Sequence, residues 1–209
     1  MQDDQRIGDG EEARHSLDLT ERGMSAVQDM LGVLRDADRE IVALTRRVRQ
    51  LEQLAWSDEA TGLPNRRGLE DQIQREEARA LRYGAPAAIA LLDIDAAGDI
   101  GRAYGRGAGD TVLRAVAAAM HAAARGSDLV ARYEGTTFAA LLPGADLAGA
   151  QVFVERVRIT AQFARLPSGD VIPIVIIAGV ATREEAGSLR AALDLADQRL
   201  LLNRPRRGA

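Results

Sequence analysis

The sequence contains no cysteine, no lysine and few aromatic residues. Aromatic side chains make up 3% of its 209 residues, and histidine occurs only as His15 and His121. The lack of cysteine excludes disulfides and thiolate metal sites, and two widely separated histidines argue against a zinc site. All 27 basic residues are therefore arginine. The planar guanidinium of arginine can make forked hydrogen bonds to phosphate or to the edge of guanine.

Other absences narrow the class of protein. The net charge of −4 argues against generic nucleic-acid binding, which calls for a strongly basic face. No run of eighteen apolar residues occurs, so no membrane span is expected. Residues 1–20 are acidic and polar and lack the apolar stretch of a signal peptide, which favours a cytoplasmic protein.

A heptad pattern precedes the globular part of the chain. Its apolar positions alternate in spacings of three and four: Val27, Met30, Leu34, Ala37, Ile41, Leu44, Val48, Leu51 and Ala55. Branched Ile41 at an a position with Leu44 at a d position favours a parallel two-stranded coiled coil. A single amphipathic helix packed on its own domain is the alternative. We therefore expect a disordered tail over 1–22, a coiled-coil dimerisation helix over 23–56 and a globular domain over 57–209.

Helical and strand patterns alternate in the globular part. Expected helices cover 67–83, 111–125, 147–163 and 186–202, and expected strands cover 87–92, 128–133, 137–142 and 171–181, the last broken by Pro173. Asp110 is expected to cap the second of these helices. The strand over 87–92 has no period and runs into Asp93, as a strand buried on both faces does. The alternation predicts an α/β fold with a mixed central sheet flanked by helices.

Several motifs along this part resemble the GGDEF family of diguanylate cyclases. Asp58 to Arg66 reads D-E-A-T-G-L-P-N-R, like the family's D-x-L-T-G-L-x-N-R segment. Asp93-Ile94-Asp95 resembles its first metal-binding strand, and residues 105–113 resemble its G-H-x-x-G-D-x-x-L segment. Residues 132–138 stand where R-Y-G-G-D/E-E-F belongs. The resemblance implies a nucleotide-cyclase or palm-like sheet preceded by a long coiled-coil helix.

The resemblance also implies a synthetic site, and here that site departs from the family. Joining two GTP molecules into cyclic di-GMP needs two divalent metals held by hard oxygen ligands. The family pattern assigns them to Asp93, to the carbonyl of Ile94 and to an acid at the third signature position. The signature here consists of Glu134, Gly135, Thr136, Thr137 and Phe138. Because a neutral hydroxyl cannot replace an anionic ligand, we expect no metal, no required cofactor and no catalysis.

Further departures point the same way. Glu134 replaces a glycine beside the nucleotide phosphates, where its charge is expected to repel triphosphate. The family's lysine and asparagine after the metal strand are replaced by Gly98 and Gly101, and its histidine by Arg106. Asp110 matches a guanine-contacting acid, so Asp93 and Asp110 are interpreted as vestiges of the metal and substrate site. Near the end, Leu201 and Arg204 take the places of a tyrosine and a lysine.

The family's inhibitory product-binding motif, R-x-x-D, is present as Arg125-Gly126-Ser127-Asp128. Arg156 matches the second arginine of that site. A guanidinium can contact O6 and N7 of guanine, and a carboxylate can accept from its N1 and N2 hydrogens. The resemblance therefore implies cyclic di-GMP binding by Arg125, Asp128 and Arg156. The alternative is that Arg125 and Asp128 are a helix-end cation and a strand-start acid on a solvated surface.

Three functions follow as hypotheses. The first is an inactive, dimeric cyclic di-GMP receptor or regulatory scaffold that acts on an unknown effector protein. The second is a protein-interaction or localisation module that binds no nucleotide. The third is a GTP-binding domain or a residual cyclase that uses Asp93, Asp95 and unusual ligands.

Overall fold

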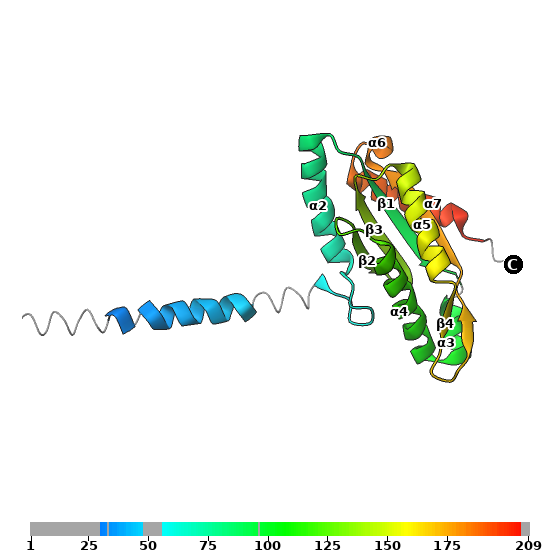
Figure 1. The fold of residues 1–209 in the computed structure, drawn as a ribbon, viewed down its shortest axis with the longest axis horizontal. Coiled ribbons are helices and arrows are strands. Elements are labelled where there is room, and N and C mark those ends of the chain that lie inside the picture. The colour runs from blue at the N-terminus through cyan, green and yellow to red at the C-terminus, as the bar shows by residue number, and fades with distance from the viewer. Residues whose placement is uncertain (1–29, 33, 48–55, 96, 206–209) are drawn as a thin grey trace, which may run out of the picture. The chain divides into compact units, whose positions relative to one another are not determined.

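The computed structural model describes residues 30–32, 34–47, 56–95 and 97–205 (Figure 1). Chain contacts divide the protein into two compact units, residues 1–52 and 53–209. In the first unit, residues 34–47 are helical. The predicted heptad residues of this unit that are described are exposed, with Met30, Leu34, Ile41 and Leu44 between 55% and 61% accessible. Val27, Val48, Leu51, Ala55 and the predicted tail lie outside the described residues, so the coiled coil stays a prediction.

The second unit alternates helices with strands. In chain order its elements are α2 (Arg66–Tyr83), β1 (Ala87–Ile94), α3 (Ala97–Tyr104), α4 (Arg106–Ala123), β2 (Leu129–Glu134), β3 (Thr137–Pro143), α5 (Leu147–Thr160), β4 (Phe163–Arg165), β5 (Val171–Pro173), β6 (Ile176–Thr182), α6 (Arg183–Ala186) and α7 (Leu189–Asn203). The predicted α/β fold with a helix-flanked central sheet is confirmed. Within the described chain, no helix combines the length and the apolar character that a bilayer crossing requires.

The central sheet has four strands in the order β2-β3-β1-β6. Each of these strand pairs is antiparallel. A parallel pairing occurs in the described chain only as an isolated bridge between Asn65 and Arg132. Strands β4 and β5 form a separate hairpin. The register places Asp93, near the end of β1, opposite Thr137 on β3 and Ile177 on β6.

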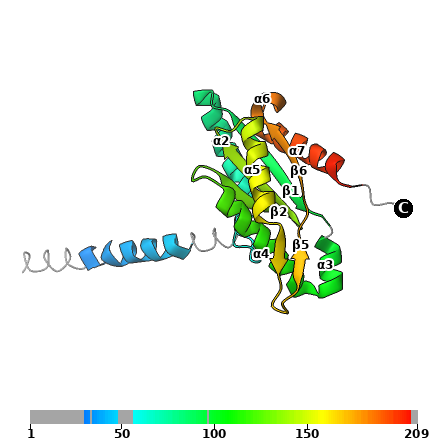
Figure 2. The ribbon, with the colours of Figure 1, turned by 45° about the vertical axis from the view of Figure 1, so that its right-hand side comes forward.

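Two hydrophobic cores lie on opposite faces of the sheet, and β1 contributes to both. Alternate residues of a strand point to opposite faces, so Leu92 packs with the core of α4 and α5 while Leu91 packs with the core of α2 and α7. Every residue of β1 is buried. The two views show α4 and α5 on one face of the sheet and α7 on the other (Figures 1 and 2). The strand predicted to be buried on both faces is therefore confirmed.

The free edge of β6 is closed by side chains from both flanking helices. Asp95 N–H donates to the carbonyl of Val175, and hydrogen-bonded pairs alternate along an antiparallel ladder. The backbone N–H and C=O groups of the even-numbered residues of β6 therefore point away from β1, toward the free edge. Their carbonyls accept as follows: Ile176 from Arg158 on α5, Ala178 from Asn203 on α7 and Val180 from Arg199 on α7. This arrangement protects an exposed strand edge. It also fixes the last turn of α7 beside the end of β1.

Two predicted helix boundaries were wrong, and one predicted strand proved to be two. The helix predicted to begin after Asp110 begins at Arg106, with Gly105 as its N-cap residue. Asp110 therefore lies inside the first turns of α4 and does not cap it. The helix predicted over 147–163 ends at Thr160 because Phe163 already belongs to β4. The break predicted at Pro173 in the strand over 171–181 is confirmed, and the two halves, β5 and β6, belong to different sheets.

Candidate functional site

Asp93 lies at the end of β1, beside the signature turn. Within the described chain it is the only carboxylate of the expected metal site in this position. The residue is 7% exposed. Its Oδ1 accepts from the hydroxyl of Thr136 at 2.7 Å and from that of Thr137 at 3.3 Å. Its Oδ2 accepts from Nη2 of Arg204 at 2.9 Å. Both carboxylate oxygens are thus engaged by side chains of the same chain.

The signature forms the turn of the β2–β3 hairpin. Gly135 has φ of +54°, a conformation that glycine adopts without steric cost. Arg132 on β2 holds this turn, because its Nε and Nη2 donate to the carbonyl of Gly135 at 3.0 and 2.8 Å. Its Nη1 lies 3.0 Å from both carboxylate oxygens of Asp58. Arg132 therefore joins the signature turn to the segment that precedes α2.

The carboxyl of Asp58 is stabilised in its charged form. Burial alone would raise its pKa, but hydrogen bonds from Thr61 and Arg132, together with the charge of the guanidinium, outweigh burial, so the pKa of Asp58 is lowered from 3.8. Thr61 donates to Oδ1 through its backbone N–H at 2.9 Å and its hydroxyl at 2.7 Å. The motif that resembled the family's opening segment thus has a structural role, which is to anchor Arg132.

Glu134 lies on the side of the hairpin that faces α2. Its carboxylate is 3.7 Å from Nη1 of Arg66 and 76% exposed. The guanidinium of Arg66 also lies over the ring of Tyr133, 4.8 Å from its centroid. An open hollow of about 780 Å³ includes these side chains, Asp58 and Arg132. The described contact of Glu134 is with Arg66, and the repulsion of triphosphate by Glu134 stays a prediction.

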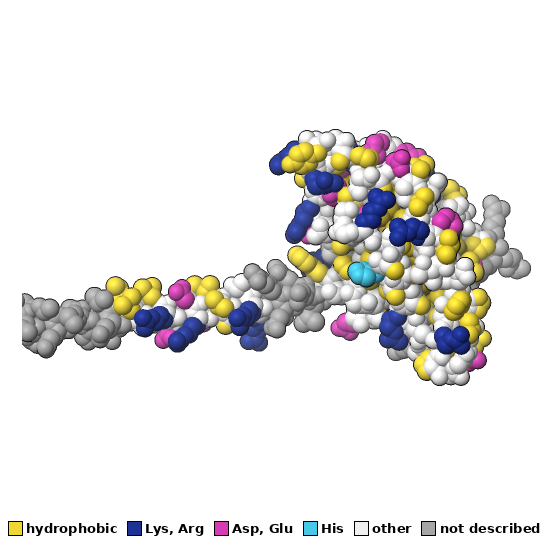
Figure 3. Space-filling model, in the orientation of Figure 1, with side chains coloured by type: hydrophobic (Ala, Val, Ile, Leu, Met, Phe, Trp, Pro, Cys, Tyr) yellow, Lys and Arg dark blue, Asp and Glu magenta, His cyan; other side chains and the backbone are white. Residues whose placement is uncertain are grey.

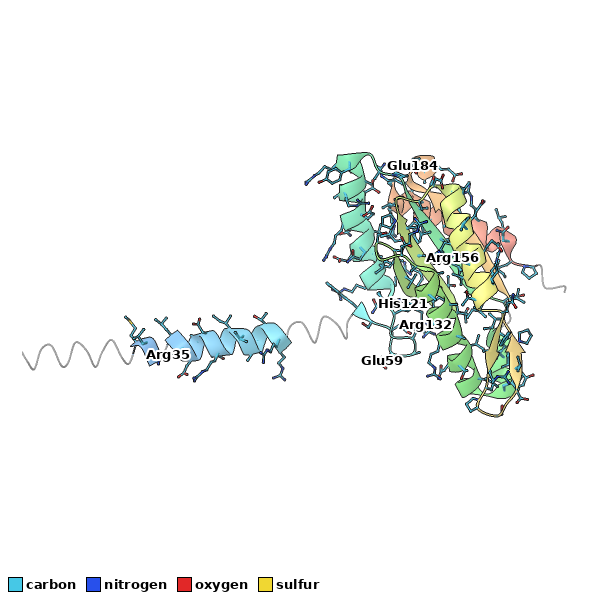
Figure 4. The ribbon with its side chains drawn as sticks, in the orientation of Figure 1. Arg35, Glu59, His121, Arg132, Arg156 and Glu184 are labelled. Carbon is cyan, nitrogen blue, oxygen red and sulfur yellow. The ribbon has the colours of Figure 1, made fainter. Side chains whose placement is uncertain are left out.

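The three residues of the predicted inhibitory site meet at one pocket. Arg125 follows α4, Asp128 precedes β2 and Arg156 projects from α5, and all three line a cavity of about 180 Å³. Figure 4 shows Arg156 on the same side of the sheet as α4. Asp146 and Gly149, at the start of α5, line the same pocket. Residues that are 31 positions apart in sequence are thus brought together, as the resemblance implied.

The two arginines of this pocket differ from the others named so far. Arg125 and Arg156 are exposed, and within the described chain no side chain pairs with either guanidinium. Basic side chains are spread over this face of the unit (Figure 3). Asp128 is engaged locally, since its Oδ2 accepts from the backbone N–H of Arg125 at 2.7 Å and its Oδ1 from Ser127 at 3.4 Å. A carboxylate has about four acceptor positions, so it can still accept hydrogen bonds from a ligand.

The residues around Asp93 do not fit a divalent metal. Magnesium prefers near-octahedral oxygen coordination with carboxylates, and the described residues contain no cluster of three or more histidine, aspartate or glutamate side chains. Thr136 and Thr137 supply neutral hydroxyls, and Arg204 places a positive charge against the remaining oxygen. Asp110, the other predicted vestige, lies on α4 and has no described contact with Asp93.

Two of these arginine roles were not foreseen from the sequence. Arg132 and Asp58 are 74 residues apart, and Arg204 and Asp93 are 111 apart. Such pairs depend on the sheet order, which no local pattern gives. One local signal existed for Arg204: it precedes Pro205, and a residue before proline is driven out of the helical conformation. That signal predicts the end of α7 but not the carboxylate that receives the side chain.

The fold and the hairpin signature define a nucleotide-cyclase-like α/β domain. The family described as "Diguanylate cyclase, GGDEF domain" matches residues 55–207, and the chain belongs to that family. It is 31% identical over 193 residues to diguanylate cyclase DgcP of Pseudomonas aeruginosa, covering 91% of this chain and 28% of DgcP. The chain thus spans less than a third of that relative.

Two solved structures are similar over most of the chain. Diguanylate cyclase SiaD of Pseudomonas aeruginosa, in complex with its activator SiaC, has a TM-score of 0.70 and 30% identity. That match covers 95% of this chain and 78% of SiaD's. The coiled coil and GGDEF domain of DgcB from Caulobacter crescentus, in complex with c-di-GMP, has a TM-score of 0.74 and 26% identity. It covers 82% of this chain and 92% of that one.

Proposed function

We propose that this protein is a catalytically inactive GGDEF-domain protein that binds cyclic di-GMP and passes its occupancy on to a partner protein. The observation that carries the proposal is the contrast between two sites. The carboxylate at the expected synthetic site accepts hydrogen bonds from the hydroxyls of Thr136 and Thr137 and is paired with the guanidinium of Arg204. The pocket of Arg125, Asp128 and Arg156 instead presents two guanidinium groups that have no side-chain partner among the described residues.

The chemistry of this pocket suits a guanine base. One guanidinium can donate in parallel to O6 and N7, and Asp128 can accept from N1–H and N2–H, which together distinguish guanine from the other bases. The second guanidinium is available for a phosphate of the same ligand. None of these contacts needs a metal ion. That DgcB was solved in complex with c-di-GMP supports the choice of ligand.

The size of the pocket indicates how much of the ligand it holds. Pockets that enclose a drug-sized ligand span roughly 300–1,000 Å³, whereas this one has about 180 Å³. It therefore suits one base and its neighbouring phosphate. The remainder of a cyclic dinucleotide would contact a second surface, and a second copy of the chain can supply one.

Titration calorimetry of the full chain with cyclic di-GMP tests the proposal. Arg125→Ala and Arg156→Ala should each weaken binding about 10- to 100-fold, because a forked guanine contact contributes roughly 1–3 kcal/mol and a hydrogen bond to a charged phosphate about 1.5–3 kcal/mol. Asp128→Asn keeps an oxygen that can accept the backbone N–H of Arg125, so it removes the charge while preserving the turn. Arg114, exposed on α4, provides the matched control, and Arg114→Ala should bind as the unaltered protein does.

Two results would contradict receptor function. One is an absence of heat with cyclic di-GMP while the protein is folded. The other is equal weakening by Arg114→Ala and Arg125→Ala, which would indicate general charge attraction. Catalysis is tested separately by incubating the protein with GTP and magnesium or manganese. Turnover that disappears in Asp93→Ala would refute the proposed inactivity and leave the binding result standing.

A nucleotide-independent interaction module is the second candidate. It is favoured by the exposed apolar positions of the helix over 34–47, among them Ile41 and Leu44. In a parallel coiled coil these residues would pack against the same residues of a second copy. The double change Ile41→Lys and Leu44→Lys should abolish dimers in sedimentation velocity. If partner capture is lost in this double variant but retained in Arg125→Ala, the interaction module is the better description.

A further inference from the structure

Asp146 is a further charged residue of the pocket in which cyclic di-GMP binding is proposed. It follows β3, whereas Asp128 precedes β2. The register of these antiparallel strands pairs Leu129 with Leu141, so the start of β2 and the end of β3 lie together at the open end of the hairpin, away from the signature turn. The fold therefore brings a second carboxylate to the pocket that contains Asp128.

The backbone around Asp146 fixes the position of its carboxylate. Two residues earlier, Gly144 has φ of +74°, and its N–H donates to the carbonyl of Pro86 at 2.7 Å. Asp146 itself is the N-cap residue of α5, where its Oδ1 accepts from the N–H of Gly149 at 2.8 Å. A Cβ added at Gly149 would lie 3.2 Å from this oxygen, so glycine preserves the space around the cap. The side chain is thus oriented before a ligand arrives.

Capping of α5 uses one oxygen of this carboxylate and leaves the other free. Within the described chain, no hydrogen bond or ion pair involves Oδ2 of Asp146, and the residue is exposed. An ionised carboxylate only accepts hydrogen bonds. Oδ2 is therefore an acceptor that lines the pocket and is not needed by the helix.

Guanine has a hydrogen that the proposed contacts do not use. Its Watson–Crick edge carries one hydrogen on N1 and two on N2, and Asp128 can accept from N1 and from only one of the two on N2. We propose that Oδ2 of Asp146 accepts the remaining N2 hydrogen, which makes Asp146 a specificity-determining residue for the 2-amino group of guanine. This role rests on the proposed function and adds to it a second carboxylate that reads the base.

Titration calorimetry of the full chain with cyclic di-GMP and with cyclic di-IMP tests this role. Cyclic di-IMP has hypoxanthine in place of guanine, so it lacks the 2-amino group. In Asp146→Asn the amide oxygen keeps the cap, because Asn and Asp are about equally good N-cap residues, while an amide nitrogen, which is a donor, replaces Oδ2. The preference for cyclic di-GMP over cyclic di-IMP should fall about three- to tenfold, the usual net contribution of one hydrogen bond.

The ratio of the two affinities separates this contact from general effects. Both ligands carry two phosphates, so the loss of one negative charge from the protein changes both affinities by the same factor. Asp194, exposed on α7, provides the matched control, and Asp194→Asn should keep the preference of the unaltered protein. If circular dichroism shows that Asp146→Asn is unfolded, Asp146→Ser replaces it, because Ser also caps helices well.

A preference that is unchanged or larger in Asp146→Asn would overturn the role of Asp146. An equal fall in Asp194→Asn would do the same, because the effect would then not belong to the pocket. Either result leaves receptor function standing, provided that cyclic di-GMP still binds and Arg125→Ala still weakens its binding. Absence of binding of both ligands to the unaltered chain is the different result that refutes the proposed function, and the role of Asp146 with it.

Discussion

The packing of α7 on β6 allows a quantitative test at Gly179. A Cβ added at this position would lie 2.0 Å from the carbonyl oxygen of Ala196 and 2.4 Å from the backbone nitrogen of Leu200. Both neighbours are backbone atoms of α7, so neither can move away by a rotamer change. Gly179→Ala must push the helix from the sheet by more than an ångström, and Ala196 and Leu200 are at most 1% exposed. Overpacking a core costs about 1–3 kcal/mol and occasionally more, so we expect a loss of at least about 3 kcal/mol.

Urea unfolding followed by circular dichroism measures this loss. Gly109→Ala in α4 is the matched control, because a Cβ there meets nothing within 4 Å. In a helix that change stabilises by up to about 1 kcal/mol. The two alanine substitutions should thus shift the free energy of unfolding in opposite directions. A value for Gly179→Ala within about 1 kcal/mol of the unaltered protein would refute the close approach of α7 to β6, given a stability of about 5–15 kcal/mol for ordinary domains.

Three further changes test separate parts of the fold. The lowered pKa of Asp58 contributes stability above its unfolded value of 3.8 that is lost as pH falls through the folded value. Arg132→Gln should reduce that acid-dependent loss in thermal melts between pH 5 and pH 2. Asn65→Ala removes the N-cap of α2, where Oδ1 accepts from Gly68 N–H, and should cost about 0.5–2 kcal/mol in urea unfolding. Met120→Ala empties a fully buried position and should cost about 2–5 kcal/mol by the same assay.

The fold was largely predictable because its strongest signals are local. The unbroken apolar run of β1 identified a central strand, and the two strands on either side of residues 134–136 were also predicted. Boundaries failed where glycine or mixed patterns weakened the signal. The start of α4 was predicted too late, after Asp110, because the helix-weakening glycines Gly105, Gly107 and Gly109 lie there.

The candidate site was predictable only in part. The Arg125, Asp128 and Arg156 positions came from family resemblance, and the structure places them around one pocket. The partners of Asp93 and Asp58 were missed because ion pairs between distant segments follow from strand order. The sequence also suggested that Glu134 faces the nucleotide phosphates. Its observed contact with Arg66 depends on how α2 lies beside the hairpin, which spacing alone does not reveal.

The arginines named here fall into two groups: those that pair with a carboxylate of the same chain, and those whose charge is available to a ligand. With no lysine in the chain, arginine supplies both. Arg132 and Arg204 each pair with a partly or largely buried carboxylate, so a ligand anion would have to displace that partner before binding them. Arg125 and Arg156 have no such competitor within the described chain, and an anion can bind them without breaking an ion pair. The electrostatic cost of anion binding is therefore lower at the pocket between α4 and α5 than at the signature turn, and that difference is why binding is proposed at the pocket.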